Sequence, residues 1–279
     1  MGEPLPIGVC LRAIRAEPRW WLESARRLDG AGYKAVWCWD HFMGRGAATV
    51  PVVESWTVLS MAAAQTSRVT VGPFVLNVMN RHPALVARMA ATLQIASEGR
   101  LVLGIGIGGA PREHAAYGMA FPEVPERVAR LEEAVAVMRA MWTGGPVTRE
   151  SPYYPLTDAT AFPIPVPPPP IVIGGETPAG ARLAGRIGDG WSAFDGNFEA
   201  NLPLYLEALH ASGRRREDQR VIVGFQGDWL GDDPIETSPW ATDPRETWAR
   251  WQAAGADEAI VLARTTADID ALVGAVDRW

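Results

Sequence analysis

Asp40 and His41 form the pair of residues best suited to proton transfer in this sequence, and they end the apolar run Trp37-Cys38-Trp39. Histidine titrates closest to neutral pH, so His41 is the first candidate for a general acid or base. Neighbouring residues on a strand point to opposite faces, although twist at a strand end can bring both toward one opening. Histidines with a purely structural role are also common at strand ends, so the pair alone leaves both interpretations open.

Glycine alternates with large apolar residues in a second motif, Leu101–Gly108, where every odd position is large and three of four even positions are glycine. The large side chains should pack outward, and the glycine face should leave room for a flat ligand. Gly104, Gly106 and Gly109 also match GxGxxG. That dinucleotide fingerprint requires a helix to start at once, whereas Pro111 and a long loop follow here, so we disfavour it.

A third motif, Ile171 to Pro178, ends an apolar run with Gly174 and Gly175 and then starts a helix after Thr177. Backbone N–H groups at a helix start bind anions, and glycine lets a phosphate approach closely. Recognition by backbone also suits a chain whose one lysine is Lys34. The alternative is a tight turn without a ligand.

Short apolar runs alternate with helical patterns along the chain, which is typical of parallel strands. Eight strands are predicted, at Ile7–Arg12, Ala35–His41, Val69–Asn77, Leu101–Gly108, Pro170–Glu176, Gly190–Phe194, Arg220–Leu230 and Glu258–Arg264. Helices should start near Pro18, Glu54, Pro83, Pro122, Pro178, Glu199, Pro244 and Thr266, with Thr177 and Asp243 as N-caps. This order predicts a single α/β domain, residues 1–279, folded as a (β/α)8 TIM barrel whose active site lies at the C-terminal strand ends.

Two long loops interrupt the alternation, Gly109–Phe121 after the fourth strand and Gly144–Pro169 before the fifth. The second ends in four consecutive prolines, which indicate a stiff spacer. Loops of this length are usually functional or mobile, so either could form a wall of the pocket.

The composition excludes several classes of function. The net charge of −6 argues against a nucleic-acid binder, and no apolar run is long enough to span a membrane. Residues Met1–Ile7 do not resemble a signal peptide, so we expect a cytoplasmic protein. Cys10 and Cys38 should be buried free thiols, and the absence of CxxC and HExxH spacing predicts no metal site.

Four stretches together resemble the bacterial luciferase-like superfamily. They are Arg81-His82-Pro83-Ala84, Gly99-Arg100-Leu101 through Gly108, Pro169-Pro170-Ile171 through Gly175, and Arg186-Ile187-Gly188-Asp189-Gly190-Trp191. Their order and spacing agree with the superfamily, and the resemblance extends from Ile7 to about Trp191. The region after Asp195 is much less diagnostic.

The resemblance implies a (β/α)8 barrel that binds reduced FMN or the deazaflavin coenzyme F420. It also implies a cis peptide bond at Phe74–Val75, behind the central ring of the cofactor. An Asp-His pair at this position resembles the F420 branch, in which the histidine lies over the reactive ring and manages a proton. His41 is therefore the expected catalytic residue, and the expected cofactor-binding residues are Asp40, Phe74, Val75, Asn77, Gly106, Gly108, Gly109, Gly174, Gly175 and Glu176.

Three functions remain open. The first is hydride transfer between F420 and a small organic substrate, and the second is an FMNH2-dependent monooxygenase that works with a separate flavin reductase. The third is a flavin-binding barrel without catalysis. Comparing the binding of F420 and FMN separates the first two.

The sequence departs from the sugar-phosphate dehydrogenases of the F420 branch. Those enzymes carry an acid just after the fourth-strand glycines, near the place of Gly109 here, and they hold phosphate with lysines. We therefore disfavour a sugar phosphate, although arginine could replace lysine. Trp37, Trp39 and Phe42 either form an entrance for an apolar or carbonyl-bearing substrate or belong to the core.

The helices Val53–Ala64 and Leu85–Ala96 carry more Ala, Leu and Met than one core face requires. Exposed apolar stripes of this kind are usually covered by a partner, so we predict a homodimer that uses these helices.

Overall fold

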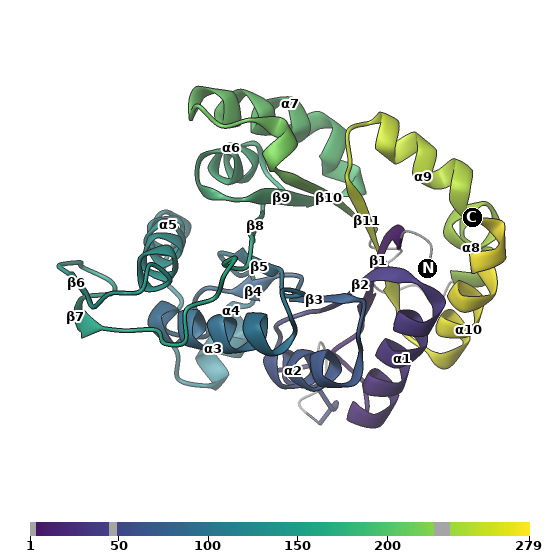
Figure 1. Cartoon of the computed structure of the whole chain (residues 1–279), viewed down its shortest axis with the longest axis horizontal. Coiled ribbons are helices and arrows are strands. Elements are labelled where there is room, and N and C mark those ends of the chain that lie inside the picture. Colours follow the sequence, from purple (N-terminus) through teal and green to yellow (C-terminus); the bar gives the residue numbers. More distant parts are fainter. Residues whose placement is uncertain (1–3, 45–48, 226–234) are drawn as a thin grey trace.

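The computed structural model describes residues 4–44, 49–225 and 235–279. Its main sheet is entirely parallel and has the order β3-β2-β1-β11-β10-β9-β8-β5-β4. β3 and β4 are two pieces of one strand position, because β4 pairs with β5 and Val71 of β3 bridges Leu101, two residues before β5. The strands therefore form a ring with helices outside it (Figure 1). The predicted (β/α)8 barrel is confirmed.

All eight predicted strand positions are confirmed, although most strands are shorter than expected. The strands are β1 (Leu5–Leu11), β2 (Tyr33–Cys38), β3 (Thr70–Pro73), β4 (Leu76–Asn77), β5 (Leu103–Gly106), β8 (Ile171–Gly174), β9 (Gly190–Phe194), β10 (Arg220–Phe225) and β11 (Glu258–Ala263). The predicted third strand is interrupted at Phe74–Val75. Residues 226–230 of the predicted seventh strand lie outside the described residues.

Proline and N-cap signals located most helices correctly. The helices are α1 (Pro18–Ala31), α2 (Ser55–Gln65), α3 (Pro83–Ala96), α4 (Pro111–Ala116), α5 (Val124–Met141), α6 (Pro178–Ile187), α7 (Asp195–Ala211), α8 (Pro239–Thr242), α9 (Pro244–Ala253) and α10 (Thr266–Ala275). Thr177 and Asp243 cap α6 and α9 as predicted. The start predicted near Pro122 was two residues early, and the start predicted near Glu199 was wrong. α5 begins at Val124 with Pro125 in its first turn, and α7 begins at Asp195, directly after β9.

The two long loops contain structure that the sequence did not predict. Residues 109–121 include the short helix α4, which has Pro111 at its first position. Residues 144–169 include an antiparallel hairpin of β6 (Val147–Arg149) and β7 (Leu156–Ala159).

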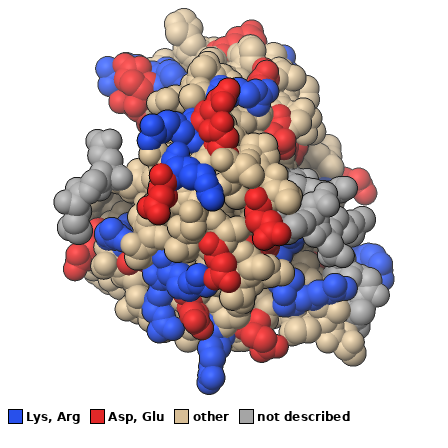
Figure 2. All heavy atoms as spheres, turned by 90° about the vertical axis from the view of Figure 1, so that its right-hand side faces the viewer, with Lys and Arg blue, Asp and Glu red and all other residues tan. Residues whose placement is uncertain are grey.

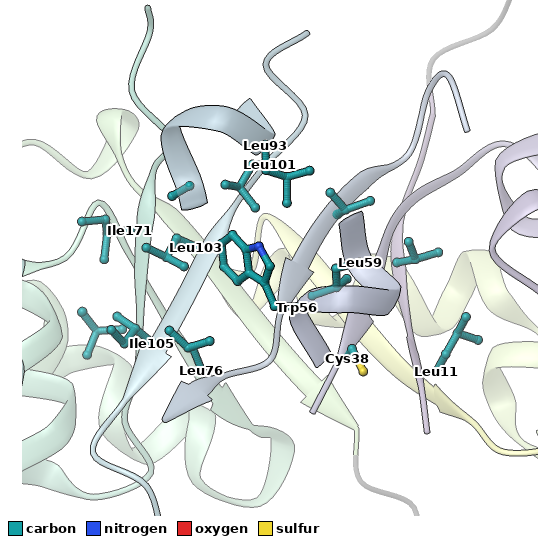
Figure 3. Close-up of a cluster of buried hydrophobic side chains, with 14 of the residues drawn as sticks. Leu11, Cys38, Trp56, Leu59, Leu76, Leu93, Leu101, Leu103, Ile105 and Ile171 are labelled. Atoms are coloured by element: carbon teal, nitrogen blue, oxygen red, sulfur yellow. The ribbon is translucent and has the colours of Figure 1, made fainter. Parts of the chain in front are cut away.

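The core has an outer layer and an inner layer. In the outer layer, α2 and α3 pack on the strands, and Trp56 of α2 lies among Leu59, Leu101 and Leu103 (Figure 3). The inner layer fills the barrel with the side chains of Cys10, Ala35, Trp37, Phe74, Val102, Val172, Ile222 and Ile260. Trp37 is fully buried in this layer, so it belongs to the core and does not form part of an entrance.

A buried carboxylate closes the N-terminal end of the barrel. Glu258, the first residue of β11, accepts a hydrogen bond from the Trp37 indole (3.2 Å) and lies 3.7 Å from the Lys34 ammonium. Burial raises the pKa of Glu258, while Lys34 and Arg220 act in the opposite direction. The one lysine of the chain thus partly neutralises a fully buried acid.

Both cysteines are buried free thiols, as predicted. Among the described residues, no helix is long and apolar enough to cross a membrane. On the face that carries α1, α9 and α10, basic and acidic side chains are interspersed (Figure 2). That face therefore has no extended patch of a single charge.

Candidate functional site

A cavity of about 730 Å³ opens at the C-terminal ends of β2, β4, β5, β8 and β9. Every site residue predicted from the sequence lines it: Asp40, His41, Phe74, Val75, Asn77, Gly106, Gly108, Gly109, Gly174, Gly175 and Glu176. These residues come from four strand positions, at β2, β3–β4, β5 and β8, that are far apart in the sequence. The barrel therefore brings all of them to one pocket, at the end where such folds place chemistry.

The His41 ring is held by a carboxylate. Its Nδ1 lies 2.9 Å from Glu113 Oε1, and the other oxygen of Glu113 accepts a hydrogen bond from the Phe42 backbone N–H (3.1 Å). The Trp39 ring meets the imidazole edge-on, with centroids 6.4 Å apart. With Nδ1–H donating to the carboxylate, Nε2 is the nitrogen left for a ligand in the pocket.

Glu113 was missed in the sequence, where only Gly109 was considered as the position of the acid that follows the fourth-strand glycines. Glu113 lies on α4 and is 8% exposed, and its contact with His41 joins residues 72 positions apart. The available signal was Pro111, which starts a helix and so turns the next acid back toward the barrel mouth. His114, expected on a loop, is instead buried on the same helix beside Ala110 and Phe121.

Asp40 is a buried junction of the pocket wall. Its two oxygens accept hydrogen bonds from Arg81 Nη1 (2.9 and 3.0 Å). The carboxylate also accepts one hydrogen bond from the Asn77 backbone N–H and one from the Asn80 side-chain amide. Arg81 also pairs with Glu54, the N-cap of α2. Burial alone would lower the pKa of Arg81, but the two carboxylates outweigh it and the pKa is raised. Asp40 thus fixes the ends of β2 and β4 relative to α2.

Val75 fills much of the space that the strand glycines leave. A Cβ at Gly106 would lie 2.9 Å from Val75 Cγ2, and one at Gly174 would lie 3.1 Å from it. At Gly104 the Pro73 carbonyl already takes the space. The expectation that these glycines directly face a ligand was therefore wrong for Gly104, because the interrupted third strand bulges against them. The Phe74–Val75 peptide bond is cis, as the resemblance implied.

The loop after β5 is held by Arg127 of α5. Its Nη1 donates to the carbonyls of Ile107 (3.0 Å) and Gly108 (2.6 Å), and its guanidinium lies over the Phe121 ring. Gly108 has a φ of +73° and lies against the Asn77 side chain, which leaves no room for a Cβ. Arg127 therefore holds the loop through which Ile107 and Gly108 line the pocket, and no local sequence pattern indicated the arginine.

The start of α6 forms the far end of the cavity. The Gly175 N–H donates to the Ser192 carbonyl (3.0 Å), so it is not available to an anion, contrary to our expectation. The Thr177 side chain caps Gly180, whereas the Ala179 N–H belongs to the first turn, where helices lack internal partners. Ala179, Arg182 and Arg186 line the cavity, so the donors at this end lie on α6 itself.

Glu176 lines the cavity, and its carboxylate is engaged by residues at the end of β9 and the start of α7. It accepts hydrogen bonds from the Phe194 N–H (3.0 Å) and from Asn197, both next to the β9–α7 junction. Burial raises the pKa of this carboxyl. The Glu176 side chain thus connects the ends of β8 and β9, and the Asn201 side chain donates to its backbone carbonyl (3.0 Å).

Comparisons with known proteins agree with this architecture. A family model described as luciferase-like monooxygenase matches residues 8–227. An F420-dependent glucose-6-phosphate dehydrogenase of Kineococcus radiotolerans is 38% identical over 76% of this chain, and one of Nakamurella multipartita is 39% identical over 79%. The matched segments span only 65% and 66% of those relatives. The structure of an F420-dependent secondary alcohol dehydrogenase superposes with a TM-score of 0.82 at 22% identity, covering 99% of both chains.

Proposed function

The chain belongs to the luciferase-like monooxygenase family, and on that premise we propose that it is an oxidoreductase that transfers hydride between coenzyme F420 and a small organic substrate. The observation that carries the proposal is the Asp40-His41 pair in the pocket wall, with His41 held by Glu113. Relatives that are 38% and 39% identical are F420-dependent dehydrogenases, which supports the same cofactor.

The residues of the pocket fit a long ligand with a flat apolar part and an anionic part. Phe74, Val75 and Leu131 supply apolar walls, and the Val75 side chain has room in its present position only because Gly106 and Gly174 lack side chains. At the other end, the first turn of α6 and two arginines suit a phosphate and an acidic tail. Phe74 and Val75 would hold the ring, and Ala179, Arg182 and Arg186 the phosphate side.

Bound F420 supplies a deazaflavin ring that accepts or donates a hydride. When an alcohol carbon loses a hydride, the hydroxyl oxygen must also lose its proton to form the carbonyl. His41 Nε2 is placed to take that proton, since Nδ1 is committed to Glu113. In the reverse direction, the imidazolium returns the proton. Glu113 keeps the ring oriented, and Asp40 keeps the strand end that carries His41 in position.

Fluorescence titration with oxidised F420 and with FMN tests the cofactor assignment. We expect F420 to bind much more tightly than FMN, and hydride transfer to be seen on addition of a substrate alcohol. Tight binding of FMN instead would favour the monooxygenase that works with a flavin reductase. Binding of either cofactor without any turnover would favour a barrel that only binds it.

Gly174→Val should weaken cofactor binding far more than it weakens folding. A Cβ at this position already approaches Val75 within 3.1 Å, so a larger side chain pushes Val75 into the pocket. A misfit of about one methylene in an apolar pocket costs about 1–3 kcal/mol of binding, which corresponds to a roughly 5- to 150-fold rise in the dissociation constant. Titration and thermal unfolding of the same samples separate the two effects. An unchanged dissociation constant would show that the cofactor lies elsewhere.

Glu113→Gln should lower kcat with little change in cofactor affinity, because the amide holds the imidazole less firmly. Partners that orient a functional imidazole typically contribute about 10–100-fold. Glu113→Asp retains the charge on a shorter side chain and should recover part of the rate. Equal losses in both variants, accompanied by a lower melting temperature, would instead assign Glu113 a purely structural role in docking α4.

We also propose a homodimer through α2 and α3. Met61 (42% exposed), Leu85 (52%) and Ile95 (44%) are large apolar side chains exposed on these helices. Light scattering at micromolar concentration should therefore give twice the chain mass, and Leu85→Glu should shift it toward the monomer. A monomeric wild-type protein would contradict this assignment.

A further inference from the structure

The short helix α4 carries two neighbouring side chains that contact the pocket wall. Glu113 holds the ring of His41 at the end of β2. The next residue, His114, is buried, and its Nε2 lies 3.4 Å from Nδ2 of Asn77, the last residue of β4. Among the described residues, Asn77 lines the cavity and His114 does not. An effect of His114 on a bound molecule must therefore pass through Asn77.

The backbone after β4 sets the orientation of the Asn77 side-chain amide. Its Oδ1 accepts a hydrogen bond from the Met79 N–H (3.0 Å), so the oxygen is committed to the chain. The amide also lies against Gly108, where a Cβ would collide with it. The atom that faces His114 is therefore Nδ2. An amide nitrogen only donates hydrogen bonds, so the imidazole nitrogen that it meets must accept one.

The second ring nitrogen of His114 locates the hydrogen of the imidazole. Nδ1 lies 3.0 Å from the carbonyl oxygen of Ala110, the N-cap residue of α4. A carbonyl oxygen can only accept, so Nδ1 carries the hydrogen and Nε2 keeps its lone pair. That lone pair is the acceptor that the Asn77 nitrogen requires. The Phe121 ring packs on the imidazole, with centroids 4.6 Å apart, and helps to keep it in this position.

We propose that His114 is a positioning residue that holds the Asn77 amide for the cofactor. Nδ2 of Asn77 has two hydrogens: one is bound by His114, and the other is left for an acceptor atom of the molecule in the cavity. The inference rests on the proposed function, in which that molecule is F420. The carbonyl oxygens and ring nitrogens of a deazaflavin are acceptors of this kind. Consecutive residues of α4 thus hold the pocket wall at two strand ends, Glu113 at β2 and His114 at β4.

Nuclear magnetic resonance of the wild-type protein labelled with nitrogen-15 histidine tests the tautomer without any ligand. The chain has four histidines, so single replacements assign each pair of ring signals. We expect His114 in the neutral form with its hydrogen on Nδ1. A hydrogen on Nε2 would overturn the proposal, because two donors would then face each other at Asn77. This measurement remains decisive even where a variant of the buried histidine fails to fold.

Two replacements separate the two hydrogen bonds of His114. His114→Gln keeps an acceptor at the level of Nε2 and loses the bond to Ala110, whereas His114→Asn keeps the reach to Ala110 and loses the bond to Asn77. Fluorescence titration should give about tenfold weaker F420 binding for His114→Asn than for His114→Gln. A purely structural role within α4 predicts the opposite order. His210→Gln, at an exposed position in the last turn of α7, is the matched control and should leave the dissociation constant unchanged.

The same pair of variants in an Asn77→Ala background shows whether His114 acts through Asn77. The two should then bind F420 equally, because the effects of coupled residues are not additive. Equal binding with Asn77 present, or a difference that persists without its amide, would overturn the proposal. If the wild type does not bind F420, the proposed function fails by itself, and the titrations with FMN then test His114 in the same way. Binding of neither cofactor would overturn both.

Discussion

Replacement of His41 by alanine should reduce the rate of hydride transfer by about 10²- to 10⁴-fold, which is the usual contribution of general acid–base catalysis. The reason is the orientation of the ring, since Glu113 holds Nδ1 at 2.9 Å and leaves Nε2 to the pocket. Cofactor affinity should fall only slightly, because the walls formed by Val75 and α6 stay in place. Single-turnover rates at saturating F420 measure the chemical step directly.

His82→Ala is the matched control for this variant. His82 caps α3 by accepting a hydrogen bond from the Ala84 N–H (3.2 Å), and it is absent from the residues that line the cavity. Loss of a cap costs about 1 kcal/mol of stability and should leave the rate unchanged. A rate loss confined to His82→Ala would refute the assignment of His41 and remove the main support for F420.

Replacement of Arg81 by methionine should destabilise the protein by about 3–5 kcal/mol, the usual cost of leaving one partner of a buried ion pair alone. The Asp40 side chain is 1% exposed and would keep only its contacts with Asn77 and Asn80. The free energy of unfolding in urea measures the loss. Cofactor affinity should fall as well, since Asp40 and Asn77 both lie in the pocket wall.

Two further variants test whether the unpaired Asp40 carboxylate causes this loss of stability. The double variant Asp40→Asn with Arg81→Met replaces the unpaired carboxylate by a neutral amide. It should recover part of the lost stability, because the effects of contacting residues are coupled. Arg27→Met breaks the exposed pair with Asp270 and should cost at most about 1 kcal/mol. Equal losses of unfolding free energy in Arg27→Met and Arg81→Met would show that the buried Asp40–Arg81 pair stabilises the protein no more than an exposed ion pair does.

The barrel could be predicted because its signals are local. Apolar runs mark the strands, and a proline at Pro18, Pro83, Pro178 or Pro244 marks the first turn of a helix. α7 was placed four residues too late because it follows β9 without a connecting loop. Pro203 also lies inside this helix, where proline usually indicates a boundary.

The residues that line the pocket could be predicted, but their partners could not. Strand ends converge in any parallel barrel, so the positions of His41, Asn77 and Gly174 follow from the order of the strands. Glu113 and His41 are 72 positions apart in the sequence, so their contact depends on how the loop after β5 folds back toward β2. Hydrophobic periodicity does not predict that arrangement. The sequence interpretation left Trp37 open between an entrance and the core, although its position on the same inward face as Ala35 already favoured the core.

The ion pair at the closed end of the barrel limits how this protein can be labelled. Lys34 carries the one side-chain amine of the chain, and that amine lies beside the buried Glu258. Reagents that acylate lysine would remove the charge and leave the carboxylate without its nearest cation. Maleimides offer no substitute, because both thiols are buried and burial raises their pKa values. A dye or a surface tether is therefore better placed on a cysteine introduced at an exposed site such as Arg215.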